Sequence, residues 1–365
     1  MKFSKLLATL KPYVAGEQPK DKKYIKLNTN ENAYPPSPGT ADVLKNFDTS
    51  ELRLYPDPDA SELKAALAKR HGVLPQNIFT GNGSDEVLGF CFPAFFDRKD
   101  CCGDTKGENK TPPVLFPDVT YSFYPVYANL YEIPYQTIPL KDDYTIDPKD
   151  YKNRDCQGII IANPNAPTGI ALKPYALEEI IAANRDKVVI IDEAYVDFCS
   201  YSLISAIKRY DNLLIIRTFS KSYSLAGARC GYAVGQKPLI DALDTVKNSF
   251  NSYTLDRITQ KIALVSCNDG GYYDMINERI INIRDDTAQK LRKEGFSVLN
   301  SSANFIFIKK TGVSGERLYT ALREKGILTR YFDGARTRDF VRVTIGTEEE
   351  MRIFLQKIKE IVKEV

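Results

Sequence analysis

Three polar segments hold the side chains best suited to chemistry. In SKSYSLAGAR, Lys221 stands between two serines and Arg229 follows later, so an amine lies among small hydroxyls that suit a phosphate. In IIDEAYVDF, Asp192 ends an apolar run and could face a cation, and Tyr195 could present its phenol to the same site. GNGSDE (81–86) is typical of a glycine-rich turn into a helix, whose free N–H groups can bind an anion.

Each segment also has an ordinary structural explanation. Most lysines are solvated, an Asp at the end of a strand commonly caps the next turn, and glycine-rich turns often precede helices. Lys221 differs because it follows a strand expected to be buried and has hydroxyl neighbours. No single segment decides between the two interpretations.

The single histidine, His71, limits the alternatives. It lies in SELKAALAKRHG, and we expect it at the solvent-facing end of a helix. One histidine cannot build a His-rich metal site and leaves little scope for a Ser-His-Asp triad, so we expect no metal. Lys, Asp, Tyr and Arg would have to carry any enzymatic chemistry.

The composition excludes several classes of protein. A length of 365 residues suits about two domains, and a net charge of +3 gives no electrostatic footprint for nucleic acid. No apolar run approaches the roughly 18 residues of a membrane span, and the N-terminus lacks the features of a signal peptide. Seven cysteines without metal-ligand spacing predict a reduced, cytoplasmic protein.

Buried strands must position these polar segments. Continuous apolar runs that alternate with helical patterns indicate strands buried on both faces, in a mainly parallel sheet covered by helices. The runs are GIIIANP (158–164), KVVIIDEAY (187–195), NLLIIRTFSK (212–221) and RCGYAVG (229–235). Ligands bind at the carboxyl ends of such strands, where NPNAPTG, DEAYVDF and TFSKSYS occur.

The sequence predicts an α/β chain with two domains. We expect residues 46–274 to form the large domain and residues 275–365 a small α+β domain with a strand in 302–310. Residues 1–45 would belong to the small domain or pack on it. The charged, Gly- and Pro-bearing stretch 98–113 is typical of a surface loop.

Taken together and in order, the motifs resemble those of the fold-type I aminotransferases. NPNAPTG, DEAYVDF and TFSKSYSLAGARCGY carry the resemblance. The finer pattern is similar to the histidinol-phosphate aminotransferase branch, through KPYVAGEQ, LNTNENAYPPSP, RLYPDP, GNGSDE, TYSFY and VRVTIGT. The resemblance extends from about Pro12 to the last predicted helix. It implies the fold of type I pyridoxal-phosphate transferases, with 46–274 as the cofactor-binding domain.

The resemblance also implies how pyridoxal 5′-phosphate is held. Lys221 would be the Schiff-base lysine and then the base that moves the substrate α-proton. Asp192 would pair with the ring nitrogen, and Tyr195 would bond the ring's phenolic oxygen. The other implied contacts are Gly83, Ser84, Asp85, Ser220 and Arg229 at the phosphate, Tyr121 on the ring face, and Tyr55 from a neighbouring subunit.

The implied reaction is aminotransfer between histidinol phosphate and 2-oxoglutarate in histidine biosynthesis. An amino donor and a keto acid would use one site in turn, in a homodimer with composite active sites. Arg342 would bind the anionic end of each substrate, since an arginine fork fits both a carboxylate and a phosphate. Arg330, Tyr13 and Asn30 are further candidates for the substrate pocket.

One position departs from the family pattern. These aminotransferases usually have Asn directly before Pro-Thr-Gly, and its amide bonds the phenolic oxygen of the cofactor; here the residue is Ala166. A neighbouring Asn could compensate, and we favour Asn165 over Asn163. Alternatively, Tyr195 carries the oxygen alone, or the site serves a different reaction.

Three other functions stay open at this point. A threonine-phosphate decarboxylase, or an aminotransferase for small or aromatic amino acids, would use a similar set of residues. A non-catalytic protein of the same fold is disfavoured by the joint presence of Lys221, Asp192, Tyr195 and Arg229, because a protein that only binds the cofactor needs no base.

Overall fold

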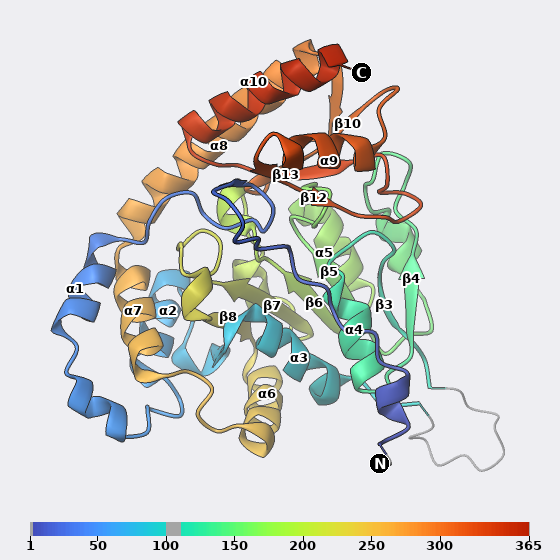
Figure 1. Cartoon of the computed structure of the whole chain (residues 1–365). Helices are drawn as coiled ribbons and strands as arrows, with labels where there is room; N and C mark the ends of the chain where they lie inside the picture. Colours follow the sequence, from blue (N-terminus) through green and yellow to red (C-terminus); the bar gives the residue numbers. More distant parts are fainter. Residues whose placement is uncertain (1–2, 100–110, 365) are drawn as a thin grey trace.

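The computed structural model describes residues 3–99 and 111–364, in which a small domain covers one end of the sheet of a large domain (Figure 1). The large sheet has the order β2-β8-β7-β6-β5-β3-β4. Its strands are β2 (Ile78–Gly81), β3 (Val114–Pro117), β4 (Tyr135–Ile138), β5 (Gly158–Ala162), β6 (Val188–Asp192), β7 (Leu213–Thr218) and β8 (Gly231–Gly235). Most of the predicted loop at 98–113 lies outside the described residues.

The five strands from β3 to β7 run parallel, which confirms the predicted mainly parallel sheet. The predicted strand at 229–235 forms β8, which is antiparallel to both of its neighbours, β7 and β2. A parallel connection needs a crossover of a dozen or more residues, usually a helix. Residues 219–230 contain only a short 3₁₀ turn, so the chain reverses direction there.

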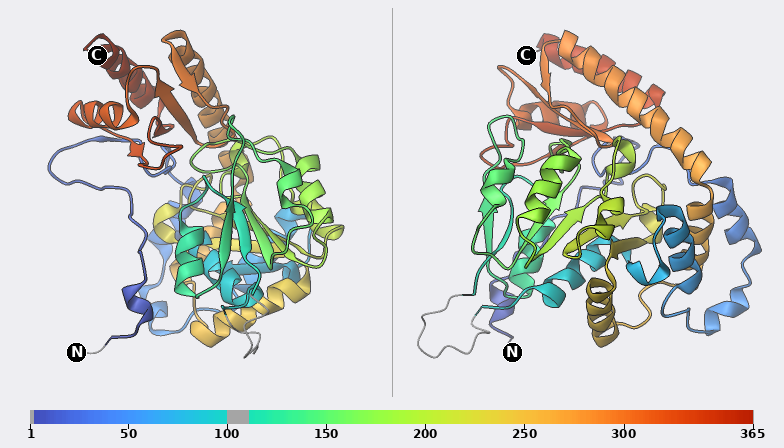
Figure 2. Two further views of the ribbon diagram at one scale, coloured as in Figure 1. Left: turned by 90° about the vertical axis from the view of Figure 1, so that its right-hand side faces the viewer. Right: turned by 180° about the vertical axis from the view of Figure 1, so that it is seen from behind.

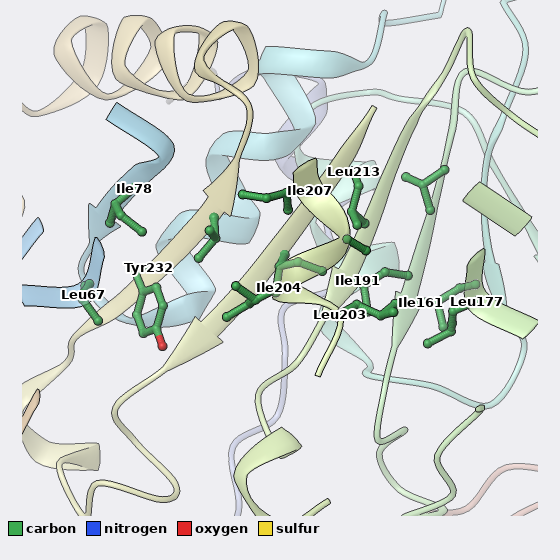
Figure 3. Close-up of a cluster of buried hydrophobic side chains, with 14 of the residues drawn as sticks. Leu67, Ile78, Ile161, Leu177, Ile191, Leu203, Ile204, Ile207, Leu213 and Tyr232 are labelled. Carbon is green, nitrogen blue, oxygen red and sulfur yellow. The ribbon is translucent and has the colours of Figure 1, made fainter. Parts of the chain in front are cut away.

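Helices cover both faces of the large sheet, which makes its strands continuously apolar. Ile161, Ile191 and Leu213 pack on one face, together with Leu67 of α2 and Leu177 of α5 (Figure 3). Helix α7 contributes Ile262 to the same cluster. Ile160 and Ile190 pack on the other face, against α3, α4 and α6. The helices are α1 (Pro38–Asn46), α2 (Ser61–His71), α3 (Gly83–Phe95), α4 (Phe123–Leu130), α5 (Pro174–Ala182), α6 (Lys237–Phe250) and α7 (Arg257–Asn268).

The small domain has its own sheet and its own core. A four-stranded sheet of order β12-β13-β10-β9 packs against α8, α9 and α10. Its elements are α8 (Gly270–Lys293), β9 (Phe296–Val298), β10 (Phe305–Lys310), α9 (Gly315–Glu324), β11 (Ile327–Leu328), β12 (Arg330–Tyr331), β13 (Val341–Thr344) and α10 (Glu348–Glu364). Among the described residues, no helix combines the length and apolar character that crossing a membrane requires.

The N-terminal segment joins the two domains. Its strand β1 (Ile25–Lys26) pairs in parallel with β11 of the small domain, whereas α1 packs on α7 of the large domain. Helix α8 runs from the large domain into the small one, as two further views show (Figure 2). The division into 1–45, 46–274 and 275–365 stays a proposal, and its second boundary falls within α8.

His71 does not face solvent as the sequence suggested. It is the last residue of α2, and its Nε2 lies 2.9 Å from the Tyr232 hydroxyl, with the two rings stacked. Burial beside the positive charge of Arg217 lowers the pKa of His71 to about 3. The histidine is therefore neutral at physiological pH.

Candidate active site

A cavity of about 290 Å³ lies at the carboxyl ends of β5, β6 and β7, between the two domains. Its wall combines segments from the N-terminal region to β13, which the sheet topology brings to one edge. The predicted site residues that line it are Tyr13, Asn30, Ser84, Asp85, Tyr121, Asp192, Tyr195, Ser220, Lys221, Arg229, Arg330 and Arg342.

Lys221 follows β7 and extends toward the N-terminal segment. Its Nζ lies 3.4 Å from the carbonyl oxygen of Thr29 and 5.7 Å from the ring centroid of Tyr195. The Asn32 amide donates to the carbonyl oxygen of Lys221 over 3.1 Å, which fixes the main chain of the lysine. The N-terminal segment, through Thr29 and Asn32, thus helps strand β7 to hold the amine at the cavity.

A buried ion pair supports the Lys221 loop from the opposite side of the sheet. The Ser222 hydroxyl donates to the Asp197 carboxylate, which also pairs with Arg217 on β7. Both Arg217 and Ser222 are buried. Because a buried charge is costly without its partner, this pair fixes where the loop leaves the strand.

Asp192, the last residue of β6, presents a carboxylate at the bottom of the cavity. The Tyr124 hydroxyl donates to its Oδ2 over 2.9 Å, and the Ala194 N–H donates to Oδ1 over 3.1 Å. Burial raises the pKa of Asp192 to about 6, although both hydrogen bonds oppose the shift. The site therefore favours a cationic partner for this carboxylate. Sequence reasoning missed Tyr124, because a tyrosine on a helix looks like an ordinary core residue.

The start of α3 and Arg229 form a cup for an anion. Gly83 has a φ of +78°, and a Cβ there would lie 2.5 Å from Nη2 of Arg229, so glycine lets the guanidinium reach the first turn. Arg229 donates to the Asp85 carboxylate over 2.8 Å, and that carboxylate also accepts from the Tyr121 hydroxyl over 2.8 Å. The first-turn N–H groups, including that of Ser84, have no intrahelical acceptor and can bind the anion.

A second glycine brings this helix start onto the sheet. A Cβ on Gly231 of β8 would lie 2.3 Å from the backbone nitrogen of Ser84, which no other residue could tolerate without moving α3. Ser220, in the same wall, accepts a hydrogen bond from the Thr218 hydroxyl over 3.0 Å. The anion cup therefore depends on close backbone contact between β8 and α3.

Arg342 on β13 supplies a partly buried cation at the other end of the cavity. Its Nη2 donates to the carbonyl oxygen of Asn28 over 2.9 Å, and its guanidinium lies 5.3 Å from the Phe305 ring and 5.4 Å from the Phe332 ring. Its Nε is buried and has no hydrogen-bond partner within the described chain. Burial lowers the pKa of Arg342. An anionic ligand would satisfy both the charge and the free donor.

The N-terminal segment closes one side of the cavity. Arg330 donates to the carbonyl oxygens of Val14 and Ala15 over 2.8 and 3.2 Å, and Tyr13 stacks on Phe123 with ring centroids 4.4 Å apart. Both residues line the cavity, as expected. Arg330 thus holds this segment in place, in addition to standing beside Arg342.

The amides favoured to compensate for Ala166 are used within their own turn. Asn165 donates to the carbonyl oxygen of Val119 and to the Thr168 hydroxyl, each over 3.0 Å. The Asn163 amide donates to a main-chain carbonyl over 3.4 Å. Neither side chain lines the cavity, whereas Ala166 does. Both amides are therefore already used in contacts within or beside the turn.

Tyr55 lies outside this cavity. It is 75% exposed and stacks on Tyr253 with ring centroids 4.6 Å apart. Phe250, at the end of α6, is 77% exposed. Tyr55 therefore does not contribute to the cavity of its own chain.

The cavity fits pyridoxal 5′-phosphate by the chemistry of its donors. The cup that glycine leaves open at Gly83 suits the phosphate, and Lys221 offers an amine. Asp192 is buried and forms no ion pair with the residues that the structure describes, as the partner of a protonated ring nitrogen would be. Tyr121 offers an aromatic ring in the wall, and Tyr195 a phenol.

Comparison with known proteins agrees with this geometry. Residues 22–358 match the model of the family described as aminotransferase class I and II. The histidinol-phosphate aminotransferase of Brachyspira hyodysenteriae is 50% identical over 356 residues, which cover 97% of each chain. That of Clostridium botulinum strain 657 is 46% identical over 100% of this chain and 99% of its own.

A solved structure has the same fold. Histidinol-phosphate aminotransferase from Sinorhizobium meliloti, in complex with pyridoxal 5′-phosphate, superposes with a TM-score of 0.86 at 23% identity and covers 100% of this chain and 98% of its own. The fold, the matched residues and the close relatives lead to one conclusion. This chain belongs to the class I and II aminotransferase family.

Proposed function

We propose that this chain is a pyridoxal-phosphate-dependent histidinol-phosphate aminotransferase, which moves an amino group from histidinol phosphate to 2-oxoglutarate, or back from glutamate. The observation that carries the proposal is that one cavity holds the Lys221 amine, the buried Asp192 carboxylate and two sites for anions, at Arg229 and at Arg342. Close relatives over the full length of the chain bear this name. A role in histidine biosynthesis follows from the same relatives.

The residues of the chain divide the work. When bound, the cofactor supplies an aldehyde that condenses with amines and a ring that withdraws electrons from the substrate carbon. Nζ of Lys221 holds the cofactor and later takes the proton from the substrate α-carbon. Asp192 keeps the ring nitrogen protonated, and Tyr195 bonds the phenolic oxygen. Arg229 and the start of α3 bind the phosphate.

Arg342 explains how one site accepts two amino donors. Glutamate presents a carboxylate beside the reacting carbon, and histidinol phosphate presents a phosphate ester. A guanidinium fork with a free Nε–H can bind either anion. Arg330 stands beside it as a second cation.

We further propose a cytoplasmic homodimer with composite active sites. Two exposed aromatic rings, Tyr55 and Tyr253, stack on each other at the surface, as residues of a subunit interface could. In a dimer, Tyr55 would reach the cofactor phosphate of the neighbouring subunit.

The activity is tested directly with the purified protein. We expect glutamate to form from histidinol phosphate and 2-oxoglutarate, with no glutamate from a Lys221→Ala variant that remains folded. The variant should keep much of its affinity for the cofactor, because the phosphate contacts remain. Release of carbon dioxide from threonine phosphate, without amino transfer from histidinol phosphate, would show that the proposed reaction is wrong.

The second prediction concerns Asp192. Its folded-state pKa of about 6 exceeds the ordinary 3.8, so the cofactor-free protein loses stability as pH rises through this interval. Asp192→Asn should therefore raise the free energy of unfolding at pH 8 by roughly 3 kcal/mol, and the gain should vanish below pH ~4. Urea unfolding of both cofactor-free proteins at the two pH values measures it. An equal gain at both pH values would point to packing instead of charge.

The third prediction concerns Arg342. Replacement by Ala should raise KM for glutamate and for histidinol phosphate together, by roughly one to two decades, since a charge-assisted contact contributes about 1.5–3 kcal/mol. Arg342→Lys is the matched control: it keeps the charge but loses the fork, and should recover part of the affinity. A rise in KM for only one substrate would contradict the shared anion site.

The fourth prediction concerns composite sites. Tyr55→Phe should weaken cofactor binding, and mixing this variant with Lys221→Ala should restore activity, because one site of the heterodimer then has both native groups. Subunit exchange is verified with differently tagged chains. If exchanged heterodimers stay no more active than their parents, Tyr55 does not act across subunits.

A further inference from the structure

At position 166 the cavity wall has a methyl group in place of the amide that the family pattern predicts. Neither Asn163 nor Asn165 of the same turn replaces that amide in the wall. Ala166 lines the cavity and packs with Phe305 and Tyr195, whereas the side chains of Asn163 and Asn165 hold the turn together. Ala166 offers only a methyl group to the cofactor. The Tyr195 phenol, which lines the same cavity, is therefore the group that we expect to donate to the phenolic oxygen of a bound cofactor.

A different amide holds that phenol. Nδ2 of Asn30 donates to the Tyr195 hydroxyl over 2.9 Å. A hydroxyl that accepts one hydrogen bond still has its own proton to donate, and it becomes a better donor because hydrogen bonds in a chain polarise one another. With Asn30 behind it, Tyr195 is left to direct its proton into the cavity.

Asn30 is itself rigidly held. Its φ of +56° lies in the left-handed region that Asn adopts more readily than most residues. Its N–H donates to the Thr344 hydroxyl over 2.9 Å, and its Oδ1 accepts from that hydroxyl over 3.0 Å. Its carbonyl oxygen accepts from the Asn304 amide over 3.0 Å. The residue is 1% exposed, and its amide donates toward Tyr195.

We propose that Asn30 is a positioning residue for the cofactor: its amide orients the Tyr195 hydroxyl toward the phenolic oxygen and strengthens that hydrogen bond. The amide that aminotransferases usually have in place of Ala166 bonds the phenolic oxygen directly. Asn30 supports the same oxygen indirectly, through Tyr195. Asn30, first assigned to the substrate pocket, acts through Tyr195. This inference rests on the proposed function, of which it needs only the binding of pyridoxal 5′-phosphate.

Two substitutions at one position separate this role from a structural one. Asn30→Gly keeps the positive φ and removes the amide, because glycine adopts this conformation freely. Asn30→Asp keeps the size, a backbone tolerance close to that of Asn and the oxygen that accepts from Thr344, but it replaces the amide donor by an acceptor. If Asn30 only held the fold, the buried charge of Asn30→Asp would weaken the binding of every ligand alike, with or without a phenolic oxygen.

The experiment measures cofactor affinity in cofactor-free protein, by titration with two ligands. The first ligand is pyridoxal 5′-phosphate, and the second is its 3-deoxy analogue, which lacks the phenolic oxygen. We expect both variants to bind pyridoxal 5′-phosphate roughly threefold to tenfold more weakly and the analogue as tightly as the unchanged chain does. Asn30→Gly should have no further effect in a Tyr195→Phe background, because the amide then has no phenol to orient.

Three outcomes would overturn the inference. These are an equal loss for both ligands, effects of Asn30→Gly and Tyr195→Phe that simply add, and an Asn30→Asp variant with unchanged affinity. In each case the unchanged chain still binds the cofactor, so the proposed function stands. If the unchanged chain fails to bind pyridoxal 5′-phosphate, the proposed function and this inference fall together.

Discussion

A carboxylate buried at the end of a central strand is the constraint around which the site is arranged. Asp192 and Glu193 are consecutive and point to opposite sides of the sheet, so two negative charges are withdrawn from water at one place. On the far side, Glu193 accepts from the Ser202 hydroxyl and the Leu203 N–H, each over 2.6 Å, and lies 3.9 Å from Arg217. Asp192 on the near side has two donors but, within residues 3–99 and 111–364, no equally close cation, and this difference leaves it to bind a charged ring.

The two ends of the cavity are set by different parts of the molecule. The anion cup belongs to the large domain, where glycine at 83 and 231 lets α3 and Arg229 close around a phosphate. The second anion site belongs to the small domain, because Arg342 lies on β13. The relative position of the domains therefore fixes how far the substrate's acidic group stands from the cofactor. Arg330 and the N-terminal segment sit across that junction.

Much of this site could be read from the sequence because each of its motifs follows a buried strand. Apolar runs located β5, β6 and β7, so Lys221 and Asp192 had to meet at one edge of a parallel sheet. Contacts between distant segments gave no such signal. Tyr124 reaches Asp192 across 68 residues, and Asn30 reaches Tyr195 across 165. His71 was misjudged because helical spacing does not reveal that Tyr232 packs against the end of α2.

The pairing of Asn30 with Thr344 spans 314 residues and has a consequence for biogenesis. Strand β1 leaves the ribosome well before its partner β11, which lies far downstream in the chain. Such contacts raise the contact order and make folding slow, because the chain loses the entropy of closing a long loop before the contacts can stabilise it. A nascent chain that has emerged as far as β8 contains the anion cup. It still lacks Arg342, and it lacks Thr344 and Asn304, the residues that hold Asn30. Until the small domain emerges, strand β1 lacks its partner and its edge stays unpaired. Unpaired edges favour aggregation, from which chaperones protect nascent chains.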